Sequence, residues 1–200
     1  MNSNTAEVAA AAARLVVEEG LEYAGAKRKA ARAVGGRVEL PRSEAVEDEV
    51  RSYLALFCAD TQPAELRALR RIALRWMVRL AEFRPHLGGA AWRGTATRLS
   101  SLHLDLYCDD GKAMEIALIN LGISYDTDSL PGTHHGRRSE PVSLLTIADD
   151  CPELGETVTL HLAVRDLEEL KGALKPDARG QTWRGDAVAL RRLLDEGATP

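Results

Sequence analysis

The sequence has few cysteines and no long apolar run. Its three cysteines, Cys58, Cys108 and Cys151, form no CxxC pair. An odd, scattered set predicts reduced thiols rather than a disulfide framework. No apolar segment approaches the roughly 20 residues that span a bilayer. The first residues lack the basic start and strongly apolar run of a signal peptide. We therefore expect a cytoplasmic protein with no membrane partner.

Aromatic residues are also scarce, and neither positive nor negative residues are in large excess. Aromatic side chains make up 4% of the 200 residues, too few to interleave with basic side chains as single-strand nucleic-acid binding requires. We accordingly interpret Trp92 and Trp183 as packing residues. Residues 1–100 carry 16 Lys and Arg against 12 Asp and Glu, and residues 101–200 carry 10 against 18. Neither half is basic enough to indicate nucleic-acid binding by charge alone.

Helical periodicity dominates the first part of the chain. Apolar spacing and caps predict helices over 5–19, 23–34, 43–57 and 61–83. Asn4 and Glu7 form a capping box for the first of these helices, and Gly20 is a natural stop. We predict a helical region over residues 1–60.

Beyond Pro85 the pattern changes to short strands and short helices. We predict strands at 86–92, 102–107, 123–125, 141–148 and 157–164, and helices at 111–121, 165–174 and 186–194. The stretch 129–139, rich in Gly, Pro, His and Arg, predicts an exposed loop; an alternative is that its His134 and His135 fold over a pocket. The order predicts an α+β fold, in which a small mixed β-sheet covered by helices occupies 61–200.

One motif carries most of the functional information. Leu87-Gly88-Gly89 precedes, by thirteen residues, the segment His103-Leu104-Asp105-Leu106. Leucines alternate with polar residues from 102 to 107, which is the period of a half-buried strand. His103 and Asp105 therefore share a face, about 7 Å apart along the strand.

This arrangement resembles the signature of polymerase-beta-like (minimal) nucleotidyltransferases. In that superfamily a hydrophobic residue and Gly-Gly or Gly-Ser precede two carboxylates spaced one apart on a strand. A third carboxylate comes from a later strand. The family's Asp-x-Asp…Asp becomes His103-x-Asp105…His161 here. The resemblance spans roughly residues 63–165, and bacterial proteins with an alanine-rich helical N-terminus ahead of such a degenerate domain are similar over the whole chain.

The resemblance implies a nucleotidyltransferase-like fold with a phosphate and metal site. Gly88, Gly89 and the small hydroxyl residue Ser101 would contact the phosphates of an NTP. Asp105 would be the surviving ligand of Mg²⁺ or Mn²⁺. His103 and His161 would be secondary ligands or proton carriers, and Zn²⁺ would be the metal if the histidines are ligands.

Three interpretations remain open. Loss of two of three carboxylates favours a nucleotidyltransferase-fold pseudoenzyme that binds a nucleotide or an RNA or protein partner. A second interpretation is an active metal-dependent nucleotidyltransferase, using Asp105 with His103, His161 or the nearby Asp109. In the third, the match is a coincidence and His103 and Asp105 are the polar side of a strand.

Basic residues on two predicted helices give a hypothesis of another class. Arg67, Arg71, Arg75 and Arg79 repeat at i+4 and form one stripe, and Lys27 and Arg28 belong to a second cluster. The stripe is either solvated, paired with Glu44, Glu47, Asp48 and Glu49 of the preceding helix, or a contact surface for phosphate or nucleic acid. The last option would make the chain a non-enzymatic nucleic-acid-binding or regulatory protein.

Overall fold

The chain divides into two compact units. The structure, a computed structural model, describes residues 3–35, 39–134, 137–177 and 179–196, and for Ser3, 131–134 and 137–140 it describes the backbone alone. Unit 1 comprises Met1–Leu66 together with Thr95–Ser100, and unit 2 comprises Arg67–Gly94 and Ser101–Pro200. Along the described residues, none of the helices combines the length and apolar character needed to cross a bilayer.

Unit 1 is a small helical assembly built on alanine and valine. It contains α1 (Ser3–Glu19), α2 (Tyr23–Val34), α3 (Ser43–Phe57) and the first turn of α4 (Gln62–Arg79). The predicted helices over 5–19, 23–34 and 43–57 are confirmed. α1 packs against both α2 and α3. The shared core consists mainly of Val8, Ala9, Ala12, Ala13, Val16, Ala26, Ala30, Val46, Val50 and Leu54. These mostly small side chains recur at helical spacing, which lets the helix axes approach closely.

The segment Thr95–Ser100 completes unit 1 although it lies far along the chain. Gln62 donates from Nε2 to the Ala96 carbonyl over 2.9 Å, and the Arg98 backbone N–H donates to the Glu65 carboxylate over 2.9 Å. Gly20, which ends α1, adopts a φ of +68°, and a Cβ there would lie 2.8 Å from the Leu99 carbonyl oxygen. Only glycine fits this position without strain.

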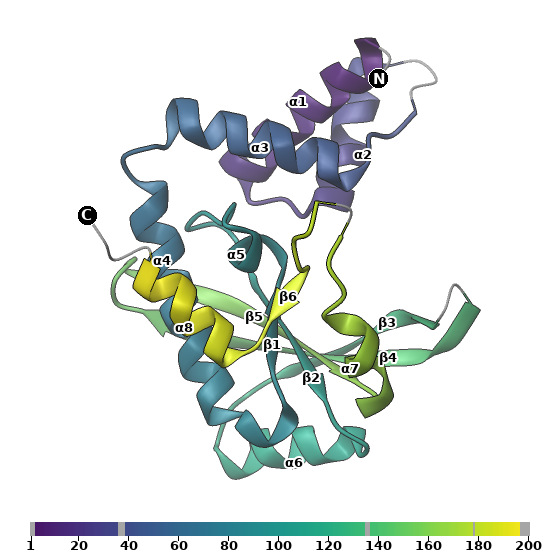
Figure 1. The fold of residues 1–200 in the computed structure, drawn as a ribbon, viewed down its shortest axis with the longest axis vertical. Helices are drawn as coiled ribbons and strands as arrows, with labels where there is room; N and C mark the ends of the chain where they lie inside the picture. Colours follow the sequence, from purple (N-terminus) through teal and green to yellow (C-terminus); the bar gives the residue numbers. More distant parts are fainter. Residues whose placement is uncertain (1–2, 36–38, 135–136, 178, 197–200) are drawn as a thin grey trace. The chain divides into compact units, whose positions relative to one another are not determined.

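Unit 2 is an α+β structure around a six-stranded mixed sheet, as predicted (Figure 1). The strands lie in the order β3-β4-β5-β2-β1-β6. β2 and β5 run parallel, and the other neighbouring pairs are antiparallel. The strands are β1 (His86–Gly88), β2 (Leu102–Tyr107), β3 (Asp126–His134), β4 (Arg137–Cys151), β5 (Glu156–Arg165) and β6 (Arg184–Gly185).

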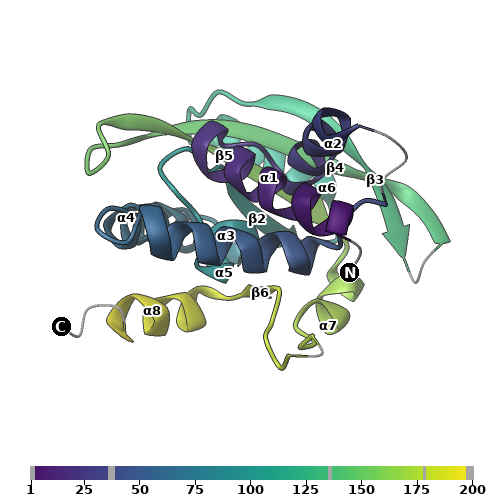
Figure 2. The same ribbon diagram turned by 90° about the horizontal axis from the view of Figure 1, so that it is seen from above.

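Short helices connect and flank these strands. They are η1 (Ala81–Phe83), α5 (Gly89–Arg93), α6 (Gly111–Asn120), η2 (Leu167–Glu169), α7 (Leu170–Ala173) and α8 (Ala187–Glu196). Asp110 caps α6 by accepting the Lys112 backbone N–H over 2.9 Å, and Asp186 accepts the Ala189 N–H at the start of α8 over 2.8 Å. Each carboxylate thus satisfies a backbone N–H in the first turn of its helix. Figures 1 and 2 show β6 continuing directly into α8.

One face of the sheet is the core of unit 2. Its fully or almost fully buried residues include Leu102, Leu104, Leu106, Leu145, Ile147, Leu160 and Leu162. α4 packs on this face, where Trp76 donates from Nε1 to Asp149 on β4 over 2.6 Å. The opposite face of the same strands is therefore the one that carries His103, Asp105 and His161.

Three sequence predictions for this unit are wrong. The strand expected over 86–92 stops at Gly88, because Gly89 has a φ of +62° and starts α5. The strand expected at 123–125 begins instead at Asp126. The loop expected over 129–139 is, in its described part, the end of the β3–β4 hairpin, which carries a register shift between Leu130 and Gly132. His135, one of its two histidines, lies outside the described residues.

The glycine at the end of α1 gives a stability prediction. Gly20→Ala should lower the free energy of unfolding by roughly 2 kcal/mol, since a residue with a side chain pays about 1–2 kcal/mol for left-handed backbone and here meets Leu99. Urea denaturation measures the change.

Gly25→Ala is the matched control, because a Cβ at Gly25 in α2 has no neighbour within 4 Å. It should be neutral or stabilise by up to about 1 kcal/mol. Equal effects of the two substitutions would contradict this account of unit 1.

Candidate functional site

The strand register of unit 2 lines up the residues singled out from the sequence. Arg184, Gly88, His103, His161 and Thr146 occupy matched positions on five neighbouring strands. Residues matched across a sheet point to the same face. Asp105 follows His103 by two residues on β2, so it points to the same face, beside Ala163 of β5. Folding thus brings together Gly88, His103, Asp105 and His161.

These residues line a cavity of about 310 Å³ in unit 2. That volume lies at the lower end of the range for small-molecule sites. Its polar lining consists of His103, Asp105, His161, Arg165 and Arg184, with the backbone of Gly88 and Gly89. Leu104, Leu130, Leu144, Ala163 and Trp183 complete the wall. Ser101, predicted to contact phosphate, is not among the lining residues.

Asp105 is held between two arginines. Arg165 donates from Nε to Oδ1 over 2.5 Å, and Arg184 approaches Oδ2 with Nη1 at 2.7 Å. The Asp105 side chain is only 14% exposed. Burial alone would lower the pKa of Arg165, but Asp105, with smaller contributions from Glu169 and Tyr107, outweighs burial and raises the pKa above its ordinary value. The guanidinium therefore keeps its charge.

Tyr107 extends this cluster along the same face of β2. Arg184 donates from Nη1 to the Tyr107 hydroxyl over 2.9 Å. Burial, reinforced by the charge of Asp105, raises the pKa of the Tyr107 phenol. The phenol is thus a neutral partner. Asp105, which contacts both arginines, and Glu169, which contacts Arg165 at 3.4 Å, are the anions beside them.

This arrangement does not fit the metal site that the resemblance implies. Mg²⁺ and Mn²⁺ need carboxylate oxygens, yet both oxygens of Asp105 already bind guanidinium groups. Imidazoles stand at the other two positions. Among the residues that the structure describes, no group of three or more His, Cys, Asp and Glu side chains is arranged to hold a metal ion. The predicted ligand set of His103, Asp105 and His161 is therefore not assembled as a metal centre.

The two histidines form a stacked pair. Their ring centroids are 5.1 Å apart and their planes are inclined by 30°. Thr146 and His161 share a hydrogen bond of 3.1 Å between Oγ1 and Nδ1. The His103 ring packs directly on Gly89, where an added Cβ would come within 3.1 Å of His103 Cδ2. Gly89 is thus needed for the approach of His103, and phosphate contact by the glycine pair stays a prediction.

Sequence reasoning missed Arg165, Arg184 and the exposure of Trp183. Arg165 had a signal, because it follows His161 and Ala163 at alternate positions, but we expected it to begin a helix. It is instead the last residue of β5. Arg184 comes from a two-residue strand after an irregular stretch, and nothing local predicts its position. Trp183 is 38% exposed and lines the cavity, so it is more than a packing residue.

Trp92 is a packing residue, as predicted. Its Nε1 donates to the Thr182 carbonyl over 2.9 Å. A Cβ at Gly185 would lie 2.0 Å from the Trp92 ring. Trp92 therefore holds the chain on both sides of Trp183 and Arg184.

A turn at Asp177 anchors the segment before Trp183. Its carboxylate accepts the backbone N–H groups of Arg179 and Gln181 over 2.9 and 3.0 Å, and pairs with Arg93 at 3.3 Å. The N–H of Gln181, then that of Arg179 and the Arg93 guanidinium, hold the pKa of Asp177 below its ordinary value of 3.8, against the opposing effect of burial. The charged form of Asp177 thus stabilises the wall of the cavity.

Two of the four arginines in the α4 stripe pair with acids of unit 2. Arg71 contacts Glu153 at 2.9 Å and Arg75 contacts Asp149 at 2.5 Å. The predicted pairing with Glu44, Glu47, Asp48 and Glu49 is wrong for these two arginines. Arg79 lies over the Trp76 ring at 5.2 Å, and Arg67 also has an interaction partner.

The second basic cluster belongs to unit 1. Lys27 donates to Ser43 Oγ over 3.1 Å, and Arg28 is exposed on α2. Contact of either cluster with nucleic acid stays a prediction.

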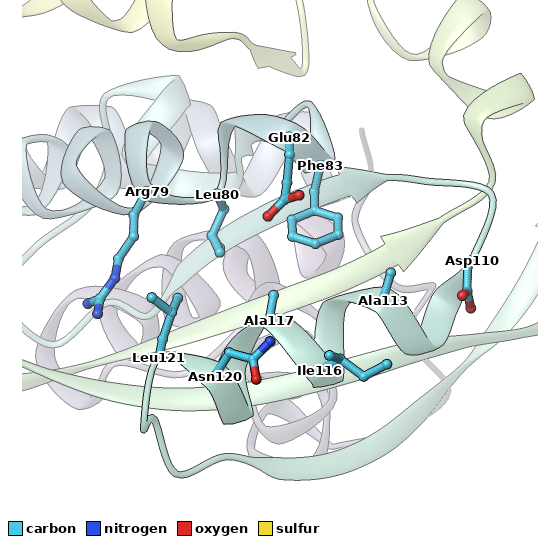
Figure 3. A pocket seen from close by; sticks show the side chains of 10 residues that line it. All are labelled: Arg79, Leu80, Glu82, Phe83, Asp110, Ala113, Ile116, Ala117, Asn120 and Leu121. Atoms are coloured by element: carbon cyan, nitrogen blue, oxygen red, sulfur yellow. The ribbon is translucent and has the colours of Figure 1, made fainter.

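A second cavity of about 390 Å³ lies between the end of α4, η1 and α6. Figure 3 shows Arg79, Leu80, Glu82 and Phe83 on one side, and Asp110, Ala113, Ile116, Ala117, Asn120 and Leu121 on the other. Its apolar residues are flanked by charges of both signs. This second cavity is not lined by Gly88, Gly89, His103, Asp105 or His161.

Comparisons with known proteins give little beyond this geometry. No family model matches the chain, and neither does a curated protein. A solved structure of the Cid1 poly(U) polymerase with MgGTP bound is similar at a TM-score of 0.36 and 11% identity. The match covers 57% of this chain and 38% of that chain, so the chain corresponds to well under two thirds of that protein. We therefore argue the chemistry of the site from the residues of this chain and not from that similarity.

The lowered pKa of Asp177 predicts a pH-dependent stability. A carboxylate with a depressed folded-state pKa adds stability above its unfolded-state pKa, and that stability is lost as pH falls through the folded-state value. Asp177→Asn keeps the acceptor oxygen and removes the charge. The stability difference from the parent chain should therefore be full at pH 6 and shrink below about pH 4.

Chemical denaturation of both proteins between pH 7 and pH 2.5 measures this difference. Asp195→Asn, at the exposed end of α8, is the control and should show little change. A difference for Asp177→Asn that stays constant down to the lowest pH would contradict the role given to its charge.

Proposed function

We propose that unit 2 binds a phosphorylated ligand of the nucleotide class in the 310 Å³ cavity and does so without metal-dependent nucleotidyl transfer. One observation carries this proposal. Arg165 and Arg184 converge on the single carboxylate of Asp105, at the position where the resembling enzymes place metal ligands. Two fixed positive groups replace the cations.

The residues that line the cavity carry more positive than negative charge. They include two guanidinium groups and one carboxylate, while Glu169, which pairs with Arg165 at 3.4 Å, is not a lining residue. Guanidinium groups suit phosphate because their planar N–H fork matches phosphate oxygens. His103 and His161 add imidazole groups, and each neutral ring has one N–H that can donate to phosphate in the matching tautomer.

Arg184 has an incomplete set of partners. Its Nε is buried and lacks a hydrogen-bond acceptor among the described residues. A buried donor without a partner costs about 1–3 kcal/mol. An oxygen-rich ligand that lets Arg184 reorient would recover part of this cost, so the side chain is suited to respond to an anion.

The same observation argues against catalysis of the kind that the resemblance implies. Transfer of a nucleotidyl group through two metal ions needs carboxylates that are available to bind them. Asp105 is engaged by arginines, and histidines occupy the other two positions. The proposal is therefore a nucleotide-binding pseudoenzyme.

Binding in the absence of metal tests the proposal. ATP, GTP, CTP and UTP should each be titrated by calorimetry in EDTA and again in excess Mg²⁺. We expect at least one nucleotide to bind in EDTA and to raise the melting temperature by mass action. The free energy of unfolding should increase by about 2.7 kcal/mol when the ligand is at 100 times Kd.

Arg165→Gln and Arg184→Gln should each weaken that binding at least about tenfold, as expected when a charge-assisted hydrogen bond is lost. Arg71→Gln is the control, since Arg71 is exposed on α4 and pairs with Glu153. Binding that requires Mg²⁺ and yields pyrophosphate would overturn the proposal, as would the absence of binding by all four nucleotides.

A further inference from the structure

An exposed indole stands in the wall of the proposed anion site. Trp183 is 38% exposed, whereas Trp76 on α4 is 3% exposed. Trp183 lines the same cavity as Arg165, His103 and His161. The wall of the cavity has both apolar and charged residues, and a large apolar ring left open to solvent there gains hydrophobic free energy when a ligand covers it.

One face of this indole is already occupied. The guanidinium of Arg93 lies 4.5 Å from the ring centroid of Trp183, within the range of a cation–π contact. Arg93 is itself fixed by its ion pair with Asp177, and both side chains are almost completely buried. The indole thus packs on a cation that is itself held in place, and part of its surface lines the cavity.

The backbone on both sides of Trp183 is also fixed. The Thr182 carbonyl accepts the Trp92 indole N–H. Arg184 pairs with Gly88 in the sheet and with Asp105 through its side chain. Little side-chain or backbone order remains to be gained on binding, which is the condition for a preorganised contact.

The position of the ring relative to the anion site limits the ligand. Trp183 and Arg184 both line the cavity of about 310 Å³. A group stacked on Trp183 and an anionic group at Arg184 must both fit in this volume, so the spacer that joins them is short. A nucleobase joined to phosphate through one ribose meets this condition.

We propose that Trp183 is a ring-stacking subsite, so that the ligand of the cavity carries a flat aromatic ring as well as an anionic group. This inference rests on the proposed function and narrows it from phosphorylated ligands in general to mononucleotides. Stacking tolerates any base because every base has a π-face. The subsite thus provides affinity for a ring without selecting among the four bases.

Ligands with and without a ring test the inference. The probes are AMP, GMP, CMP and UMP on one side, and ribose 5-phosphate and inorganic phosphate on the other, all titrated by calorimetry in EDTA. The parent chain should bind at least one mononucleotide about tenfold or more tightly than ribose 5-phosphate, the ratio expected for one base–aromatic stack.

Substitutions then test whether Trp183 causes the preference for mononucleotides over ribose 5-phosphate. Trp183→Leu should remove the preference and leave ribose 5-phosphate affinity unchanged, whereas Trp183→Phe keeps a ring and should retain most of it. Phe57→Leu, an exposed aromatic on α3 of unit 1, is the matched control and should change neither affinity. Quenching of indole fluorescence on nucleotide binding, lost in Trp183→Leu, is the expected spectroscopic signature.

The outcomes separate the two proposals. If ribose 5-phosphate and the mononucleotides bind equally to the parent chain, the phosphate site stands and the stacking subsite is wrong. A preference for mononucleotides that survives in Trp183→Leu also overturns the subsite. If none of the phosphates binds, the proposed function fails and this inference fails with it.

Discussion

The ionic cluster of Asp105 with Arg165 and Arg184 is the interaction on which the site depends. It joins β2, β5 and β6, and β6 is only two residues long and pairs with β1 alone. Backbone hydrogen bonds from so short an edge strand hold it weakly. The carboxylate that binds Arg184 therefore fixes the edge of the sheet as well as the charge of the cavity.

The cluster also explains why the motif can be present without the metal-dependent chemistry that usually accompanies it. β2 presents His103 and Asp105 on one face, as the motif predicts, but among the described residues these side chains are not arranged with a third ligand to hold a metal ion. Positive charge at that place comes instead from guanidinium groups, which cannot be exchanged as ions can. Arginine is permanently protonated, and Asp105 raises the pKa of Arg165 further. In the function that we propose, these fixed charges bind an anion at neutral pH and take the place of the mobile Lewis acid that metal-assisted transfer uses.

Sequence reasoning located the strands of the site better than its charges. The alternation of Leu102, Leu104 and Leu106 with polar residues is a local signal, and the structure has β2 where it predicts. The proximity of His103 and His161 followed only from the resemblance, because a parallel pairing of β2 with β5 is not encoded by either strand alone. Arg184 could not be placed, since tertiary packing of Trp92 on Gly185 positions it. The hairpin at Leu130 was missed because pairing with β4 outweighs the turn-forming composition of the segment.

A double-mutant cycle on the ionic cluster tests the central claim most directly. Asp105→Ala, Arg184→Gln and the double variant are compared with the parent chain by urea denaturation. If Asp105 and Arg184 stabilise each other, the cycle gives a coupling free energy of about 1 kcal/mol or more, while the pair Asp105→Ala with Arg71→Gln stays additive within about 0.5 kcal/mol. Additive effects of Asp105→Ala and Arg184→Gln would contradict the account, because the carboxylate would then be free of the arginine that we place upon it.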